Sequence, residues 1–228
     1  WELLGEVPTE ARAVGVQPDG TIWVAGAVRT SVGPDRWDLA AWVYGPDKQA
    51  HGQDIYKDPT DIWNDRNERA HAVAVLPGGR VVIAGTREVV NPNPMIPVIP
   101  RGVALVYEGK GVRVGEWTSP GDNKMLSDEI LAAVATDTGV AFCGYAQDPS
   151  DPNSKPQVNV RWHDEELKEE KAPRIEVTPG GGTCNAVGYN LEGATIVGAT
   201  VSELGQGNNA WIFAVRDAAL PRVDYMKH

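Results

Sequence analysis

The chain has 228 residues, of which 42% are hydrophobic and 23% are charged, so it is long enough for one all-β domain or two small domains with a buried core. Its formal net charge of −10 at pH 7 argues against nucleic acid and against anionic membrane surfaces as partners, because both attract mainly basic side chains. No apolar run approaches the roughly 20 residues that a membrane-spanning helix needs.

The first predicted elements are two strands in "AVGVQPDGTIWVAG" at 13–26, where a Pro-Asp-Gly turn separates two apolar runs. The same order returns in three later segments, 72–85, 132–144 and 186–199. The turns are 59, 60 and 54 residues apart, measured between the glycines Gly20, Gly79, Gly139 and Gly193. A period of this size indicates a repeat architecture.

Each unit contains two further strand candidates. A third strand follows a polar loop in every unit, at 39–44, 103–107, 158–162 and 210–215. Three of these strands end in an aromatic residue, Tyr44, Tyr107 or Trp162. A fourth candidate precedes each unit, at 3–7, 54–58, 112–117 and 174–177. The chain is therefore interpreted as a single domain of four repeats, approximately 1–49, 50–110, 111–165 and 166–217.

Four antiparallel strands per unit, repeated four times, predict an all-β fold, a β-propeller of four four-stranded blades. The first strand of each unit lacks polar alternation, as in "AVGV" and "AVAV", which favours burial of both of its faces between neighbouring blades. A β-sandwich of similar strand number is the alternative fold, but it gives no reason for a 60-residue period.

The recurring pattern of small apolar residues, Pro-Asp-Gly and a second strand ending in Ala-Gly resembles the delta-60 repeat, a propeller-type repeat of bacterial secreted and surface proteins. The resemblance covers all four units and is strongest in the first two, since "TDTG" and "NLEG" replace the turn in the others. It implies a propeller fold and an extracellular, periplasmic or cell-surface location. It implies no reaction, because fold and function separate.

The two ends of the chain resemble the same strand of the repeat, since "ELLGEV" precedes the first unit and "PRVDYM" follows the fourth. A four-bladed ring that closes on itself would leave 218–228 as a spare strand or tail. The chain could also form half of a larger ring that a second copy completes as a homodimer, or belong to a longer array. Unpaired blade faces expose apolar surface, which favours a covering partner.

Cys143 and Cys184 are the only cysteines. Repeat alignment places Cys143 late in the second strand of unit three and Cys184 at the start of the first strand of unit four. These positions lie at the same height in neighbouring blades, so a disulfide is predicted, as expected of an oxidising compartment. Two buried free thiols are the alternative.

His71 lies at the start of an inner strand, at the repeat position of Arg12. Polar residues at this position could line the mouth of the central channel, and a purely structural role is the alternative. His163 is placed in a solvated turn beside Asp164 and Glu165. No motif typical of a hydrolase, a metalloprotease or a phosphate-binding loop is present.

Two long loops are predicted, at 59–70 and 87–102. The first contains Trp63 with the nearby carboxylates Asp61 and Asp65, a combination typical of sugar or peptide recognition. The second contains apolar residues that include Met95 and Ile96, which either pack on the ring or contact a protein partner.

A third loop, "QDPSDPNSKPQ", contains Asp148, Asp151 and Asn153. Oxygen ligands at this spacing could hold Ca²⁺, although the glycine and the full ligand set of an EF-hand are missing. Turn formation by Asp, Asn and Pro is the alternative, and no other cofactor is expected.

These features predict a non-catalytic binding or scaffold propeller outside the cytoplasm that contacts a protein partner through its loop-rich end. A carbohydrate-binding lectin that uses Trp63 is the second hypothesis. An enzyme with its site at the channel mouth, around His71 and Arg12, is the third.

Overall fold

The computed structural model describes residues 7–29, 36–58, 66–90, 95, 98–119, 127–148, 151, 153–168, 175–177, 181–203, 207–216 and 222–226. Every regular element in these ranges is a β-strand. In the same ranges no helix is long and apolar enough to cross a membrane.

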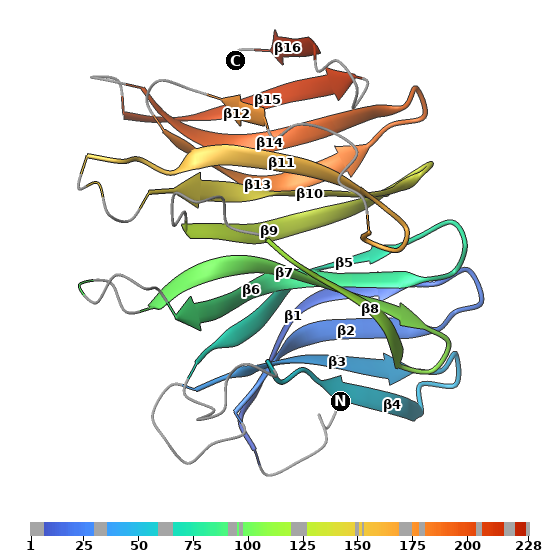
Figure 1. Cartoon of the computed structure of the whole chain (residues 1–228). Coiled ribbons are helices and arrows are strands. Elements are labelled where there is room, and N and C mark those ends of the chain that lie inside the picture. The colour runs from blue at the N-terminus through green and yellow to red at the C-terminus, as the bar shows by residue number, and fades with distance from the viewer. Residues whose placement is uncertain are drawn as a thin grey trace.

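The sixteen strands form four antiparallel sheets, each with four strands in chain order (Figure 1). The first sheet contains β1 (Thr9–Val16), β2 (Ile22–Val28), β3 (Asp38–Tyr44) and β4 (Ala50–Ile55). The second contains β5 (Glu68–Val75), β6 (Val81–Val90), β7 (Val98–Glu108) and β8 (Val112–Thr118). The third contains β9 (Ser127–Thr136), β10 (Gly139–Gln147), β11 (Gln157–Asp164) and β12 (Ile175–Val177). The fourth contains β13 (Gly182–Tyr189), β14 (Ala194–Glu203), β15 (Gly207–Arg216) and β16 (Arg222–Met226).

The outermost strand of each sheet follows the other three in the chain, whereas the repeat boundaries from the sequence put it first. β4 pairs with β3, and β8 pairs with β7. β16 pairs with β15, so this segment completes the fourth sheet and is not a spare strand. The candidate strand at 3–7 falls almost wholly outside the described residues.

The turn between the first two strands has the same geometry in the first, second and fourth sheets and a different geometry in the third sheet. Gly20, Gly79 and Gly193 have φ values of 87°, 82° and 79°, in the left-handed region that glycine adopts without strain. Gly139 instead pairs with Thr136, so only two residues connect β9 to β10. This shorter turn shifts the alignment of the third sheet by one residue.

Because of this shift, the residue in the third sheet that corresponds to Tyr44 and Tyr107 is His163 and not Trp162. Tyr107 pairs with Val81 on the neighbouring strand, and His163 pairs with the equivalent Val140. His163 is only 2% exposed, which corrects the prediction of a solvated turn. Its ring lies edge-on to Trp117 of the second sheet, with centroids 4.6 Å apart.

A β-bulge interrupts the first strand pair of every sheet. In the first two sheets it falls between Ala11 and Ala13 and between Ala70 and Ala72. The partner strand has a glycine there, and a Cβ on Gly85 would lie 1.9 Å from the carbonyl oxygen of Arg69. Gly26 and Gly144 make equally close approaches, so glycine is required at this position in the first three sheets, whereas Ala199 occupies it in the fourth.

The sheets pack face to face in chain order, as blades of a propeller do, and three shared apolar cores join successive pairs (Figure 1). The inner strands β1, β5, β9 and β13 contact one another in this order. Within the described residues the first and fourth sheets make no extensive contact. The four sheets therefore form an open arc.

The inner strands are less uniformly buried than their apolar sequences predict. β5 alternates between buried and half-buried residues, so burial of both faces is only partial there. β1 leaves Val14 and Val16 64% and 60% exposed, because no other sheet among the described residues packs against this face. The uniformly apolar sequence of the first strand therefore does not reveal which blade ends the arc.

The predicted disulfide between the third and fourth sheets is confirmed. Cys143 of β10 is bonded to Cys184 of β13, with their Cα atoms 5.6 Å apart. Both residues belong to the apolar core between these sheets. The bond therefore ties the second strand of the third blade to the inner strand of the fourth.

Candidate functional site

A polar pocket of about 470 Å³ opens where the inner strands of the first three sheets begin. It is lined by Arg12 of β1, Arg69 and His71 of β5, Thr86 and Glu88 of β6, Glu129 of β9, and the nearby Asn67 and Pro100. The β-bulges explain why two of these side chains are there. Arg12 and His71 are the extra residues of the first two bulges, and a bulge redirects its side chain out of the regular strand alternation.

Arg12 and His71 contact each other in this pocket, which agrees with their equivalent repeat positions. Nη1 of Arg12 lies 3.2 Å from Nδ1 of His71, and its Nε and Nη2 donate to Glu10 at 3.0 and 2.8 Å. Burial and the positive charges of Arg12 and Arg69 lower the pKa of His71 to about 4. The ring is therefore neutral at pH 7, with Nδ1 available as an acceptor for the guanidinium.

Asn67 fixes the wall of the pocket between the first and second sheets. Its backbone N–H and its side-chain amide both donate to Oε2 of Glu88, at 2.9 and 3.1 Å. Its amide oxygen accepts from the backbone N–H of Trp37 at 3.1 Å. The guanidinium of Arg69 lies 5.3 Å from the Trp37 ring centroid, a cation–π distance. Glu88 and Arg69 are thus held as preorganised acceptor and donor groups.

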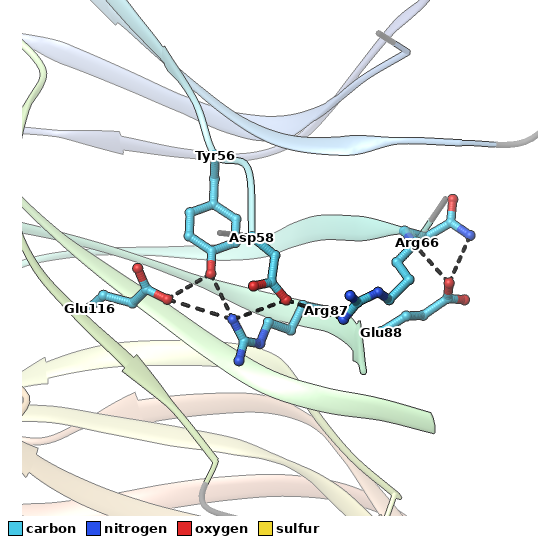
Figure 2. A network of polar contacts seen from close by, with 7 residues as sticks. Tyr56, Asp58, Arg66, Arg87, Glu88 and Glu116 are labelled. Carbon is cyan, nitrogen blue, oxygen red and sulfur yellow. Dashed lines mark hydrogen bonds and ion pairs between the residues drawn. The ribbon is translucent and has the colours of Figure 1, made fainter. Parts of the chain in front are cut away.

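A network of polar contacts, buried at Asp58 and exposed at Glu116, lies beside this wall (Figure 2). Nη1 of Arg87 donates to the Tyr56 hydroxyl at 2.8 Å and lies 3.4 Å from Asp58. Asp58 also faces Arg66 at 3.5 Å, and the Tyr56 hydroxyl donates to Glu116 at 2.6 Å. The network attaches the end of the first sheet to β6 and β8 of the second. Its member Arg66 immediately precedes Asn67, which donates to Glu88.

The opposite wall comes from the third sheet. Oε1 of Glu129 accepts a 2.6 Å hydrogen bond from the Tyr145 hydroxyl, and Oε2 lies 3.5 Å from the hydroxyl of Thr86. Burial, with the hydrogen bond to Glu129, raises the pKa of Tyr145 above its ordinary value. The phenol therefore stays protonated at neutral pH and holds Glu129 as an acceptor toward the pocket.

The loop residues expected to bind ligand are placed only in part. Trp63, Asp61, Asp65 and Ile96 lie outside the described residues. Met95 is described and is 86% exposed. The 87–102 stretch is mostly strand and not loop, since β6 continues to Val90 and β7 begins at Val98. This long hairpin starts at the polar pocket, where Glu88 pairs with Pro100.

The acidic loop after β10 forms a turn. Oδ1 of Asp151 accepts from the backbone N–H of Asn153 at 2.8 Å, and the carbonyl of Asp151 accepts from Ser154 at 2.9 Å. The backbone N–H of Asp148 donates to the Ser154 hydroxyl at 3.0 Å. No group of three or more His, Cys, Asp or Glu suited to a metal ion occurs in the described part of the chain. Calcium binding by this loop stays an untested prediction.

Sequence reasoning found Arg12 and His71 but missed Arg69, Glu88 and Glu129. Arg69 and Glu88 fall within the stretches 59–70 and 87–102 that the sequence predicted as loops, but in the structure they lie in β5 and β6, and Glu129 lies in β9. One signal was present in the sequence. Charged residues flank three of the four inner strands just before the bulge, as in "NERAHAV" at 67–73, and interrupt otherwise apolar runs.

No family model matches this chain, and no curated protein matches it either. The solved structure of the Trypanosoma rangeli sialidase in complex with the inhibitor DANA is similar, with a TM-score of 0.57 and 12% sequence identity. The likeness covers 95% of this chain and 38% of the sialidase chain, so this chain spans well under half of that structure. At this identity the likeness confirms the propeller fold. The assignment to delta-60 repeats stays a prediction.

Proposed function

We propose that the protein is a non-catalytic, extracytoplasmic binding module that holds a hydroxyl-rich ligand of the carbohydrate class in the polar pocket. The observation that carries this proposal is the composition of the pocket walls. On one wall Arg12 and Arg69 supply donors and Glu88 supplies an acceptor, and on the opposite wall Glu129 supplies a second acceptor. A sugar hydroxyl both donates and accepts, so it can bridge such opposed walls.

The size and rigidity of the pocket support a small ligand. Its volume of about 470 Å³ lies within the range of roughly 300–1,000 Å³ that is typical of small-molecule sites. Glu88 is held by Asn67 and Glu129 by Tyr145, so these acceptors are oriented before a ligand binds. The Cys143–Cys184 disulfide supports an extracytoplasmic location, because such bonds persist in oxidising compartments.

The ionisation of the site favours binding over catalysis. A general acid or base works best when its pKa lies near the operating pH. The pKa of His71 is lowered to about 4, and that of Tyr145 is raised above its ordinary value. His71 is therefore a weak base, and Tyr145 is a weak nucleophile at neutral pH.

A glycan array followed by calorimetry tests this function. We expect a defined glycan to bind, and Arg12→Ala and Glu129→Gln each to weaken it at least tenfold. Lys110→Ala, at an exposed cation in the turn between β7 and β8, is the control and should leave affinity unchanged. Absence of any glycan binding, or equal binding by all variants, would refute the proposal. Turnover of the bound glycan would refute the non-catalytic role.

A protein partner is the second candidate, and the end of the β6–β7 hairpin favours it. Val90, Met95 and Val98 are 66%, 86% and 39% exposed. Exposed apolar side chains gathered at one hairpin end are typical of protein contacts. A partner that binds there should be lost in Val90→Lys, whereas glycan binding in the pocket should persist. Loss of both activities together would indicate misfolding of the hairpin.

A further inference from the structure

Each blade presents one face to the blade before it and another to the blade after it. We call these the leading face and the trailing face. Between the first two blades, Trp23 and Ala25 belong to the trailing face of the first sheet, and Val81 and Ile83 to the leading face of the second. All four residues are 0% exposed. The cores between the later blades use the same two faces.

The leading face of the first blade meets no other blade in the described residues. Its outer part is buried around Trp42, but its inner part is open around Val14 and Val16, which are 64% and 60% exposed. The equivalent residues of the second blade, Val73 and Val75, pack against the core of the preceding interface. A depression of about 450 Å³ lies on this open part, with apolar lining residues that include Ala13, Val14, Ile22 and Val24.

The trailing face of the fourth blade is the second face that no other blade of the described residues covers. Ile212 is 48% exposed there, whereas Ala41 at the equivalent position of the first blade is 1% exposed. Ile196 corresponds to Trp23, since each pairs with the glycine of the inner strand, Gly188 or Gly15. The fourth blade thus offers two isoleucines on a face that is covered in every other blade.

One contact shows how such faces fit. A Cβ built on Gly15 would lie 2.6 Å from Cγ1 of Val73, so the inner strand of the first blade needs a glycine where the second blade inserts a valine. At the next interfaces the corresponding pairs are Ala74 with Ala133, and Val134 with Val187. The side chains of these pairs differ in size from one interface to the next, so each leading face is complementary to one particular trailing face.

Gly188 and Val14 occupy the same two positions as these contact pairs, but neither has a partner blade within the described residues. Nothing lies within 4 Å of a Cβ built on Gly188, although it occupies the position of Gly15. Val14 occupies the position of Val73 on the open leading face. A glycine inside a strand is destabilising and marks a place where another chain segment approaches closely. A contact between Val14 and Gly188 would again place a valine side chain against a glycine, as in the contact between Val73 and Gly15.

We propose that two copies of this chain pack head to tail, with the first blade of each on the fourth blade of the other. The twofold arrangement closes the ring and covers both open faces at once. A second copy is the occupant because this one sequence contains both halves of the fit: the Val14 side chain with its neighbouring depression, and Gly188 with Ile196 and Ile212. Each interface continues the blade-to-blade packing already present inside the chain.

A cysteine pair across the expected contact tests the proposal directly. The Cβ of Val73 lies 3.5 Å from a Cβ built on Gly15, which is within the span of a disulfide. We therefore expect the double variant Val14→Cys, Gly188→Cys to form a covalent dimer under mild oxidation, and the dimer to separate on reduction. A variant that pairs Gly188→Cys with Val112→Cys, at a similarly exposed valine on β8, is the matched control and should stay uncrosslinked.

Light scattering of the unmodified chain gives the second readout. We expect a dimer that Ile212→Lys and Val14→Lys each convert to a monomer with unchanged thermal stability of the blades, whereas Val112→Lys stays dimeric. A monomeric wild-type chain would overturn the proposal. So would a disulfide within one chain, which would mean that four blades close alone, or a ladder of longer crosslinked species, which would mean an open array.

Discussion

Asp128 of β9 and Arg161 of β11 form an ion pair of 2.6 Å, in which only 4% and 7% of the two side chains are exposed. The pair also joins two blades. Asp128 accepts from the backbone N–H of Gly102 in the second sheet at 2.9 Å, and Arg161 donates to Ser119 at 2.9 Å. The third blade is thereby attached to the second by buried charges as well as by apolar packing.

Asp128→Asn should destabilise the fold strongly. It removes the negative charge and leaves the Arg161 guanidinium buried without a counterion, which typically costs about 3–5 kcal/mol. The free energy of unfolding from urea titration measures this. Glu166→Gln, at the exposed partner of Lys168, is the control and should change stability by less than about 1 kcal/mol. Equal effects of the two substitutions would contradict the structural role of the buried pair.

Stability should fall as the pH drops from 7 to 4, in part because of His163. Burial, with the nearby Arg161, lowers its pKa to about 4, whereas a histidine in the unfolded chain titrates near 6.5. Between these pKa values the unfolded chain binds a proton that the folded chain excludes. The free energy of unfolding therefore falls by roughly 3 kcal/mol as the pH drops through this window. Above pH 7 the contribution is constant.

His163→Phe should reduce this pH dependence. Neither ring nitrogen of His163 has a hydrogen-bond partner among the described residues, and the ring packs against Trp117 and Phe142. Phenylalanine fits such a site without a titratable group. Urea midpoints at pH 7.5 and 4.5 measure the effect. His51→Gln, outside the core, is the control, and an unchanged midpoint difference in His163→Phe would contradict the assignment.

Removing the disulfide should lower stability without changing the blade order. Cys143 and Cys184 are 41 residues apart in sequence, and closing a loop of this size restricts the unfolded chain by about 4 kcal/mol in the chain-entropy model. The double variant Cys143→Ala, Cys184→Ala should therefore melt at a lower temperature than the oxidised protein. Reduction of the wild type should reproduce the shift, and it should have no effect on the double variant.

Gly85→Ala should damage both stability and the pocket. The new methyl group would lie 1.9 Å from the carbonyl oxygen of Arg69, so the bulged start of β5 must move. Arg69 and His71 lie on that segment, and ligand affinity should fall with stability. Gly78→Ala, where a Cβ has only the end of the Glu165 side chain at 3.4 Å, is the control. Full affinity in Gly85→Ala would show that the bulge does not position the site.

Part of the candidate site could be predicted from the sequence. Arg12 and His71 were identified because they break an apolar run at one repeat position, and the structure brings them within 3.2 Å. Glu88 and Glu129 were not identified, because they lie in β6 and β9, away from the repeat position that Arg12 and His71 share. Their approach depends on how blades pack, and the repeat period carries no information about this packing.

The sequence alone predicted the number of blades, the four strands of each blade and the Cys143–Cys184 bond. These features depend on local patterns, on turn chemistry and on positions that recur with the period. The tertiary structure decided which faces stay open and which polar side chains share a pocket. Val14 and Val73 show the physical reason, since the same residue at the same repeat position is open on the first blade and packed on the second. A residue at this position is buried only when a neighbouring blade packs against it, and only the tertiary structure shows where that happens.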